Sequence, residues 1–246
     1  MPDELSLLLL LAAIGFLGAL VYGMTGFGSA LITIPLATHF VPLSFALPVF
    51  ALVDFASALR IGLQNPKNAA KIEILHLVPF ILLGTVTGVT ALVNLPRAGA
   101  TLALGVFVLL YATYALRSRP ASALVSRRWA SLAGFACGVT GTLFGAGGPP
   151  YVIYLSHRQL SKEQFRATLT LTGVFSISIR LVAFAATGLL FKLQVWLAAA
   201  LAVLAAMVGL SIASWVFKRV TREVLLRAVA LVLLANGASL IVRAAG

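Results

Sequence analysis

Long apolar stretches separated by short loops are the feature that most constrains how this chain can fold. Most of them approach the roughly 20 residues that a helix needs to cross a bilayer. Hydrophobic residues make up 61% of the chain and charged residues 10%, whereas water-soluble domains carry roughly 45–50% and about 25%. We therefore expect an all-α polytopic membrane protein, and the composition excludes a soluble enzyme. The eight stretches are Leu5–Thr38, Phe40–Leu63, Ile74–Leu95, Ala98–Leu116, Trp129–Leu155, Ala167–Phe191, Val195–Phe217 and Val224–Val242.

The first and fifth stretches are longer than the others and are broken in the middle by glycine-rich motifs. The motif GMTGFG covers Gly23–Gly28, and the motif TGTLFGAGGPP covers Thr140–Pro150. Backbone polar groups cannot be left open to lipid, so irregular turns at membrane depth must line protein or a water-filled cavity. We expect each of these two stretches to form a broken, re-entrant hairpin whose turn lines such a cavity.

Lys and Arg are concentrated in the loops that precede stretches three, five, six and eight. If stretch five enters and returns on one side, all four loops face the cytoplasm, as the positive-inside rule favours. We expect a multi-pass protein of a bacterial-type inner (plasma) membrane with its N-terminus outside, and eight to ten spans according to how the hairpins are counted. The basic loop residues are Arg60, Lys67, Lys71, Arg117, Arg119, Arg127, Arg128, Arg158, Lys162, Arg166, Lys218, Arg219, Arg222 and Arg227.

Parts of the first half of the chain recur in the second half. A hairpin followed by three crossings leaves the chain on the opposite side of the membrane, so the second copy must be inverted. We expect two inverted repeats, each a broken hairpin plus three transmembrane helices, over residues 1–116 and 129–246, joined by a basic cytoplasmic linker over 117–128. Inverted repeats with glycine-interrupted segments are typical of secondary transporters. The matches pair Gly23–Gly26 with Gly138–Gly141 at an offset of 115 residues, Phe27-Gly28 with Phe144-Gly145 at 117, and Phe45, Phe55 and Arg60 with Phe165, Phe175 and Arg180 at 120.

The segment GMTGFGSALITIPL, the basic central loop and the segment TGTLFGAGGPPYVIYL resemble the TauE/SafE sulfite exporter family, also called the toluene sulfonate uptake permease family. The resemblance extends from about Leu7 to Val242, and the second segment is its more specific part. It implies an inner-membrane carrier of small sulfur-containing anions such as sulfite, sulfonates or sulfoacetate. The individual substrate does not carry over from the family.

The residues at the two breaks are the candidates for binding a substrate. Beyond each break a second half-helix begins with unpaired N–H groups and a partial positive charge, which suits a small anion. Each first arm also ends there with free carbonyl groups, so a cation remains the alternative. Any single hydroxyl group could equally bond within its own helix. The candidates are Thr25, Gly26, Phe27, Gly28, Ser29, Thr140, Gly141, Thr142, Phe144, Gly145, Gly147, Gly148 and Arg180.

Three charged residues within or beside the apolar stretches are candidates for function. An Arg at the centre of a membrane helix costs roughly 2.5–3.5 kcal/mol on insertion scales. Arg180 is therefore expected either to contact an anion or to act as a gate. The alternative is a structural Arg whose side chain snorkels to the outer face. Arg60, its repeat partner, is either a gating residue or a plain topology signal. Asp54, the one acid inside a stretch, could carry a coupling proton or pair with an Arg.

These observations predict a secondary transporter that moves a small sulfur-containing anion by alternating access. A passive anion channel and a non-transporting membrane scaffold are the alternatives. No GxxxxGK[ST] motif is present, so active transport would use an ion gradient, such as that of protons or sodium, or a partner. We expect no enzymatic activity, no cofactor, no metal site and no nucleic-acid partner; a homodimer stays open. The single Cys137 is interpreted as a packing residue.

Overall fold

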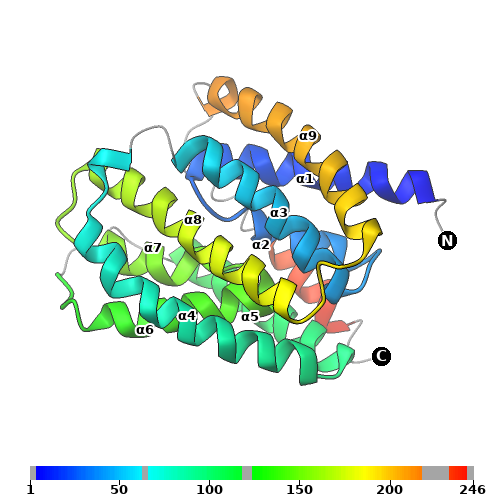
Figure 1. Cartoon of the computed structure of the whole chain (residues 1–246), viewed down its shortest axis with the longest axis horizontal. Coiled ribbons are helices and arrows are strands. Elements are labelled where there is room, and N and C mark those ends of the chain that lie inside the picture. Colours follow the sequence, from blue (N-terminus) through cyan, green and yellow to red (C-terminus); the bar gives the residue numbers. More distant parts are fainter. Residues whose placement is uncertain (1–3, 63–65, 118–123, 218–232, 243–246) are drawn as a thin grey trace.

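The computed structural model describes residues 4–62, 66–117, 124–217 and 233–242, and within them every regular element is a helix (Figure 1). The first half of the eighth apolar stretch therefore lies outside the described residues, as do the basic residues Arg119, Lys218, Arg219, Arg222 and Arg227. The elements are α1 (Glu4–Thr25), α2 (Ser29–Ala37), α3 (Leu43–Gly62), the 3-10 turn η1 (Pro66–Asn68), α4 (Lys71–Asn94), α5 (Arg97–Arg117), α6 (Trp129–Phe144), α7 (Gly148–Ser156), α8 (Lys162–Ala186), α9 (Leu193–Phe217) and the C-terminal helix Leu233–Val242.

Five of the described helices are long and apolar enough to cross a membrane: α1, α3, α4, α8, and α9 over Leu193–Ala213. The remaining apolar helices, Ala98–Tyr114 within α5, α6 and Leu233–Val242, are shorter. The expectation of a membrane protein built from helices is confirmed. The first hairpin differs from a pair of equal half-helices, because the 22 residues of α1 alone extend about 33 Å at 1.5 Å per residue.

Both glycine-broken stretches fold back on themselves. The chain leaves α1 at Thr25 and enters α2 at Ser29, and α2 then returns along α1, so that Gly18 lies against Thr33. In the second hairpin α6 ends at Phe144 and α7 begins at Gly148, with Gly147 lying against Cys137. Each hairpin therefore has its break at the bottom of a V.

The two most extensive helix pairs lie on opposite sides of the molecule (Figure 1). On one side α1 packs along α9, and on the other α4 packs along α6, with α3 and α8 between them. Small residues allow both close approaches. Gly15 lies against Ala202 in the first pair, and Gly84 lies against the carbonyl of Phe135 in the second.

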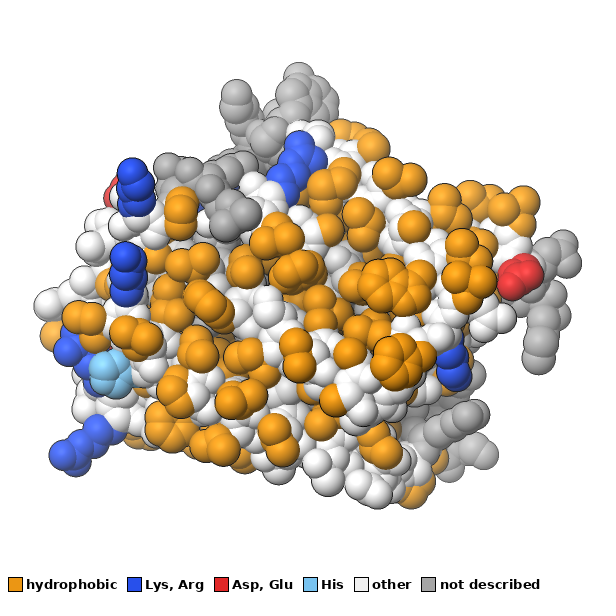
Figure 2. All heavy atoms as spheres, in the orientation of Figure 1, with side chains coloured by type: hydrophobic (Ala, Val, Ile, Leu, Met, Phe, Trp, Pro, Cys, Tyr) orange, Lys and Arg blue, Asp and Glu red, His pale blue; other side chains and the backbone are white. Residues whose placement is uncertain are grey.

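The two loops that flank the second hairpin meet at one end of the molecule. Glu73, in the first turn of α4, accepts hydrogen bonds from Arg127 before α6 and from Arg158 after α7. The backbone N–H of Val125 also donates to the carbonyl of His157. Figure 2 shows Lys and Arg side chains gathered at this end, where α4, α6 and α8 begin, while hydrophobic side chains cover most of the face drawn. The predicted grouping of basic loops is therefore seen for the loops that the structure describes.

Candidate functional site

Each hairpin turns through glycines that adopt a left-handed backbone. Gly26 directly follows α1 with φ +80°, and Gly145 directly follows α6 with φ +73°. Side chains with a Cβ are strained in this region, so glycine is the residue that allows a helix to end in this way. Gly28, with φ +87°, makes the second turn that starts α2.

The two breaks align differently in the structure than the sequence motifs predict. Gly26 and Gly145 occupy the same place at the end of the first arm, and they are 119 residues apart. That spacing is close to the offset of 120 residues at Phe45 and Phe165. The GVTG motif at Gly138–Gly141 lies inside α6, where Gly138 packs against the backbone of α4, and so it does not correspond to the turn.

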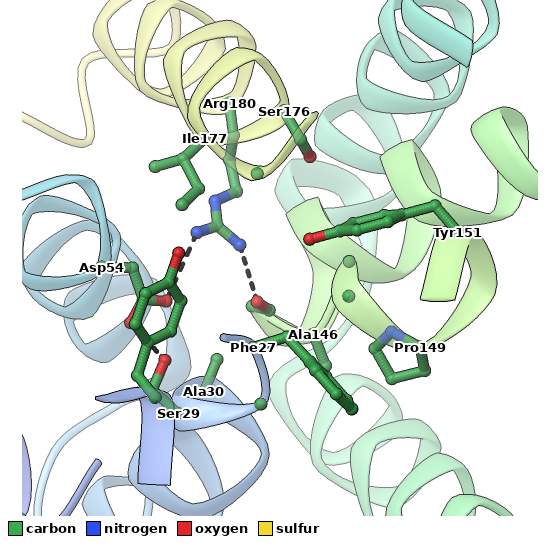
Figure 3. A pocket seen from close by; sticks show the side chains of 16 residues that line it. Phe27, Ser29, Ala30, Asp54, Ala146, Pro149, Tyr151, Ser176, Ile177 and Arg180 are labelled. Carbon is green, nitrogen blue, oxygen red and sulfur yellow. Dashed lines mark hydrogen bonds and ion pairs between the residues drawn. The ribbon is translucent and has the colours of Figure 1, made fainter. Parts of the chain in front are cut away.

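The two breaks come together around one small cavity of about 40 Å³ (Figure 3). A cavity needs about 10–15 Å³ on this measure to hold one water, so this one has room for a few waters or one small ion. Phe27 of the first break lies against Gly148 of the second, and Gly145 lies against Ala30 and Ile34. The cavity is lined by Tyr22, Phe27, Gly28, Ser29, Ala30, Asp54, Gly145, Ala146, Gly147, Gly148, Pro149, Tyr151, Gly173, Ser176, Ile177 and Arg180.

Arg180 of α8 is the central charged group of this cavity. Its side chain is only 5% exposed, and Nη1 donates to the carbonyl oxygens of Gly141 at 2.7 Å and Gly145 at 2.8 Å. These carbonyls belong to the last turn of α6 and to its cap, which helical hydrogen bonds leave free. Arg180 thereby neutralises the partial negative charge at this helix end. Its Nε–H is buried and has no protein partner, so one donor of the guanidinium remains free.

Asp54 of α3 faces Arg180 across the cavity (Figure 3). Its Oδ2 lies 3.7 Å from Nη2 of Arg180, and its Oδ1 accepts a hydrogen bond of 2.5 Å from the hydroxyl of Ser29. A buried charge is tolerated only when it is paired or hydrogen-bonded. The carboxylate thus links the start of α2 to α8. The sequence did not identify the Arg with which Asp54 could pair, and in the structure this partner is Arg180.

Two tyrosines and a serine in the cavity carry no sequence motif that marks them. The hydroxyl oxygens of Tyr151 and Tyr22 lie 3.4 and 3.7 Å from where a Cβ on Gly173 would stand, so both reach the same part of α8. Ser176 lies 3.4 Å from the sulfur of Cys137. The signal that could have found the tyrosines is position, since Tyr22 lies one turn before the first break and Tyr151 in the first turn of α7.

The structure separates the predicted site residues into two groups. Several of the predicted hydroxyl groups bond within their own hairpin: Thr25 donates to the carbonyls of Val21 and Phe27, Thr140 to those of Ala136 and Ala146, and Thr142 to that of Gly138. The residues that line the cavity are Phe27, Gly28, Ser29, Asp54, Gly145, Gly147, Gly148 and Arg180. The predicted residues of the two breaks that do not line the cavity are Thr25, Gly26, Thr140, Gly141, Thr142 and Phe144.

Two further candidates, one aromatic and one basic, do not line the cavity. Phe144 stacks on Phe107 of α5 with ring centroids 5.0 Å apart. Arg60 is exposed and donates to the carbonyl of Met207 and to the hydroxyl of Ser211 on α9. Arg60 and Arg180 therefore differ in environment, although they match in the sequence.

Comparison with known proteins agrees with the resemblance seen in the two glycine motifs. A family model described as sulfite exporter TauE/SafE matches residues 11–240, which is nearly the whole chain. No curated protein and no solved structure matches it.

Proposed function

The chain belongs to the TauE/SafE sulfite exporter family, a family of membrane transporters, and from this premise we propose that it carries a small sulfur-containing anion across the membrane. The binding site is the cavity between the two breaks, and transport proceeds by alternating access. The observation that carries the proposal is the buried guanidinium of Arg180, which lines a cavity built from both hairpins and whose Nε–H has no protein partner.

The helix ends and hydroxyl donors around the cavity favour an anion over a cation. Helices α2 and α7 begin at Ser29 and Gly148, which both line the cavity, and helix N-termini carry a partial positive charge. The opposing carbonyls at the end of α6 are already bonded to Arg180, so they are not free to coordinate a cation. The hydroxyls of Tyr22 and Tyr151 add donors that an oxyanion could accept.

Two inverted repeats would supply the movement. Exchanging α1 with α6 and α4 with α9 converts the α1–α9 pair into the α6–α4 pair, and these are the two most extensive pairs in the molecule. Exchanging α3 with α8 as well converts the α3–α9 contact into the α8–α4 contact, and the α3–α8 contact into itself. This pattern supports a pseudo-two-fold axis through α3 and α8, next to the cavity. Each repeat could then open the cavity to its own side.

The orientation follows from charge. The end of the molecule at which Arg127, Arg158 and Lys162 lie would face the cytoplasm of a bacterial-type inner membrane. The N-terminus would then lie outside, because Glu4 and Leu11 share a surface pocket with Val41 and Gln194 at the opposite end from the basic loops.

Reconstitution of the purified protein into liposomes tests this function. With labelled sulfite, sulfate and methanesulfonate, a carrier gives saturable uptake and counterflow, in which unlabelled anion inside drives accumulation of label. A channel gives uptake without saturation or counterflow, and a scaffold gives none. Absence of counterflow with all three anions would overturn the proposal.

A further inference from the structure

We propose that Asp54 carries one proton with each transported anion, so that the protein works as a proton–anion symporter. This inference rests on the proposed function and assigns its coupling ion. It is carried by the position of the carboxylate, which stands in the anion cavity, 3.7 Å from the guanidinium of Arg180.

The charged side chains that line the cavity balance each other. Among the described residues that line it, Asp54 is the only acid and Arg180 the only base. Both side chains are at least nine-tenths buried. An incoming anion would therefore give this buried space a net negative charge, which is strongly unfavourable in a medium of low dielectric constant. Neutralising Asp54 when the anion binds restores the balance, because Arg180 then pairs with the anion instead.

The proton step has a defined geometry. A proton from the side to which the cavity is open binds to Oδ2 of Asp54, and the ion pair with Nη2 of Arg180 breaks. The guanidinium then donates to the anion through Nη2 and through its unpaired Nε–H. Oδ1 can accept the hydrogen bond from Ser29 in both protonation states of Asp54. On the other side the anion leaves, the proton dissociates from Oδ2 and the ion pair forms again.

The groups that face Asp54 favour a proton over a sodium ion. Ser29 comes from α2, Tyr22 from α1, Tyr151 from α7 and Arg180 from α8. Helices α5 and α9, which also pack against α3, contribute no residue to the cavity. A sodium ion bound to the carboxylate would have to share Oδ2 with a guanidinium, and two positive charges at this distance repel each other. A proton discharges the carboxylate without adding a second cation to the site.

The position of the second repeat that matches Asp54 carries no proton site. Val174 stands 120 residues after Asp54, at the matching position of α8, and it carries no titratable group. The stoichiometry should therefore be one proton per cavity. For a monovalent anion the cycle moves no net charge, and a gradient of one pH unit supports accumulation of about tenfold.

The decisive experiment compares Asp54→Asn with the wild type in liposomes that contain a pH-sensitive dye. The matched control is Glu163→Gln, which neutralises an exposed acid at the start of α8 outside the cavity. The probes are labelled sulfite, sulfate and methanesulfonate, and protein-free liposomes give the passive background. We expect the wild type and Glu163→Gln to couple acidification of the lumen to anion entry and to accumulate methanesulfonate, the monovalent probe, about tenfold per pH unit.

Asp54→Asn should keep counterflow, because the amide resembles the protonated acid, but should lose both acidification and accumulation. Proton-driven accumulation by Asp54→Asn equal to that of the wild type would overturn the inference. Counterflow without acidification by the wild type would also overturn it, while leaving the proposed function intact. If Asp54→Asn loses counterflow, the result for Asp54→Glu decides the question, because this variant keeps a carboxylate that can bind the proton. If Asp54→Glu restores counterflow and acidification together, the inference stands; if it restores counterflow alone, the inference fails.

Discussion

Phe27 lies directly against Gly148, so that a Cβ built on Gly148 would come within 3.1 Å of Cδ2 of Phe27. The contact joins the first break to the second, between segments that are far apart in the sequence. It leaves no free space at this point, although the cavity opens immediately beside it. The width of the cavity therefore depends on the absence of a side chain at Gly148.

Gly148→Val should abolish transport while leaving the protein inserted in the membrane. The valine side chain would have to displace Phe27 or enter the cavity, which has room for only a few waters. Counterflow in liposomes measures the loss, and we expect at least a tenfold fall in rate, which corresponds to about 1.4 kcal/mol.

Gly99→Val is the matched control for this change. Gly99 lies in the first turn of α5, and a Cβ there meets no atom within 4 Å. The control should transport like the wild type. Wild-type flux through Gly148→Val would show that the break does not form the binding site.

The fold was largely predictable, because lipid allows few solutions for a chain of this composition. The glycine motifs located both breaks, and the basic loops indicated that the second hairpin returns to the end at which it starts. The unequal arms of the first hairpin also follow from the position of its motif, because Gly26–Gly28 lies nearer to the end of Leu5–Thr38 than to its start.

The cavity was predictable only in part. Sequence position identified Arg180 and Asp54, because charged groups are rare in apolar stretches. It could not show that Thr140 and Thr142 bond within α6, nor that Arg60 bonds to α9, because these contacts depend on which way each helix faces. Residues such as Ser176 of α8, which lies far from both breaks in the sequence, reach the cavity through tertiary packing alone.

Arg180→Gln should lower the rate of anion uptake about tenfold to a hundredfold, because it removes a charge-assisted donor worth roughly 1.5–3 kcal/mol. Arg60→Gln should change uptake less than about threefold, because Arg60 is exposed and outside the cavity. Initial uptake rates at several anion concentrations measure both variants. Equal effects of the two substitutions would assign Arg180 a purely structural role.

Arg180→Lys separates binding from support of the helix end. The ammonium keeps the positive charge but lacks the planar fork that holds the carbonyls of Gly141 and Gly145. We expect partial uptake with a raised KM and a lower thermal unfolding temperature in detergent. A variant with normal KM and normal unfolding temperature would contradict this assignment.

Gly138→Leu should destabilise the packing of α4 against α6. A Cβ on Gly138 would overlap the carbonyl of Ile81 and lie 2.5 Å from the backbone nitrogen of Thr85, and backbone atoms cannot move aside as side chains do. Because close helix approach in membranes relies on such small residues, we expect a fall of several degrees in the midpoint of thermal unfolding in detergent. Gly99→Leu, in open space, should leave the midpoint unchanged, and an equal midpoint in both variants would argue against this close packing.

Glu73→Gln should destabilise the protein by about 2–3 kcal/mol, because it removes the buried negative charge shared by Arg127, Arg158 and Tyr154 and replaces one acceptor oxygen with an NH2 donor. Tyr154→Phe, which removes one hydrogen bond and leaves both ion pairs, should cost about 1 kcal/mol. Glu163→Gln, at an exposed acid, should unfold like the wild type. Denaturant unfolding in detergent measures all three. Since Arg127 is half exposed, most of the loss should come from Arg158. Equal stability of Glu73→Gln and Glu163→Gln would show that this cluster does not hold the end of α7 to α4.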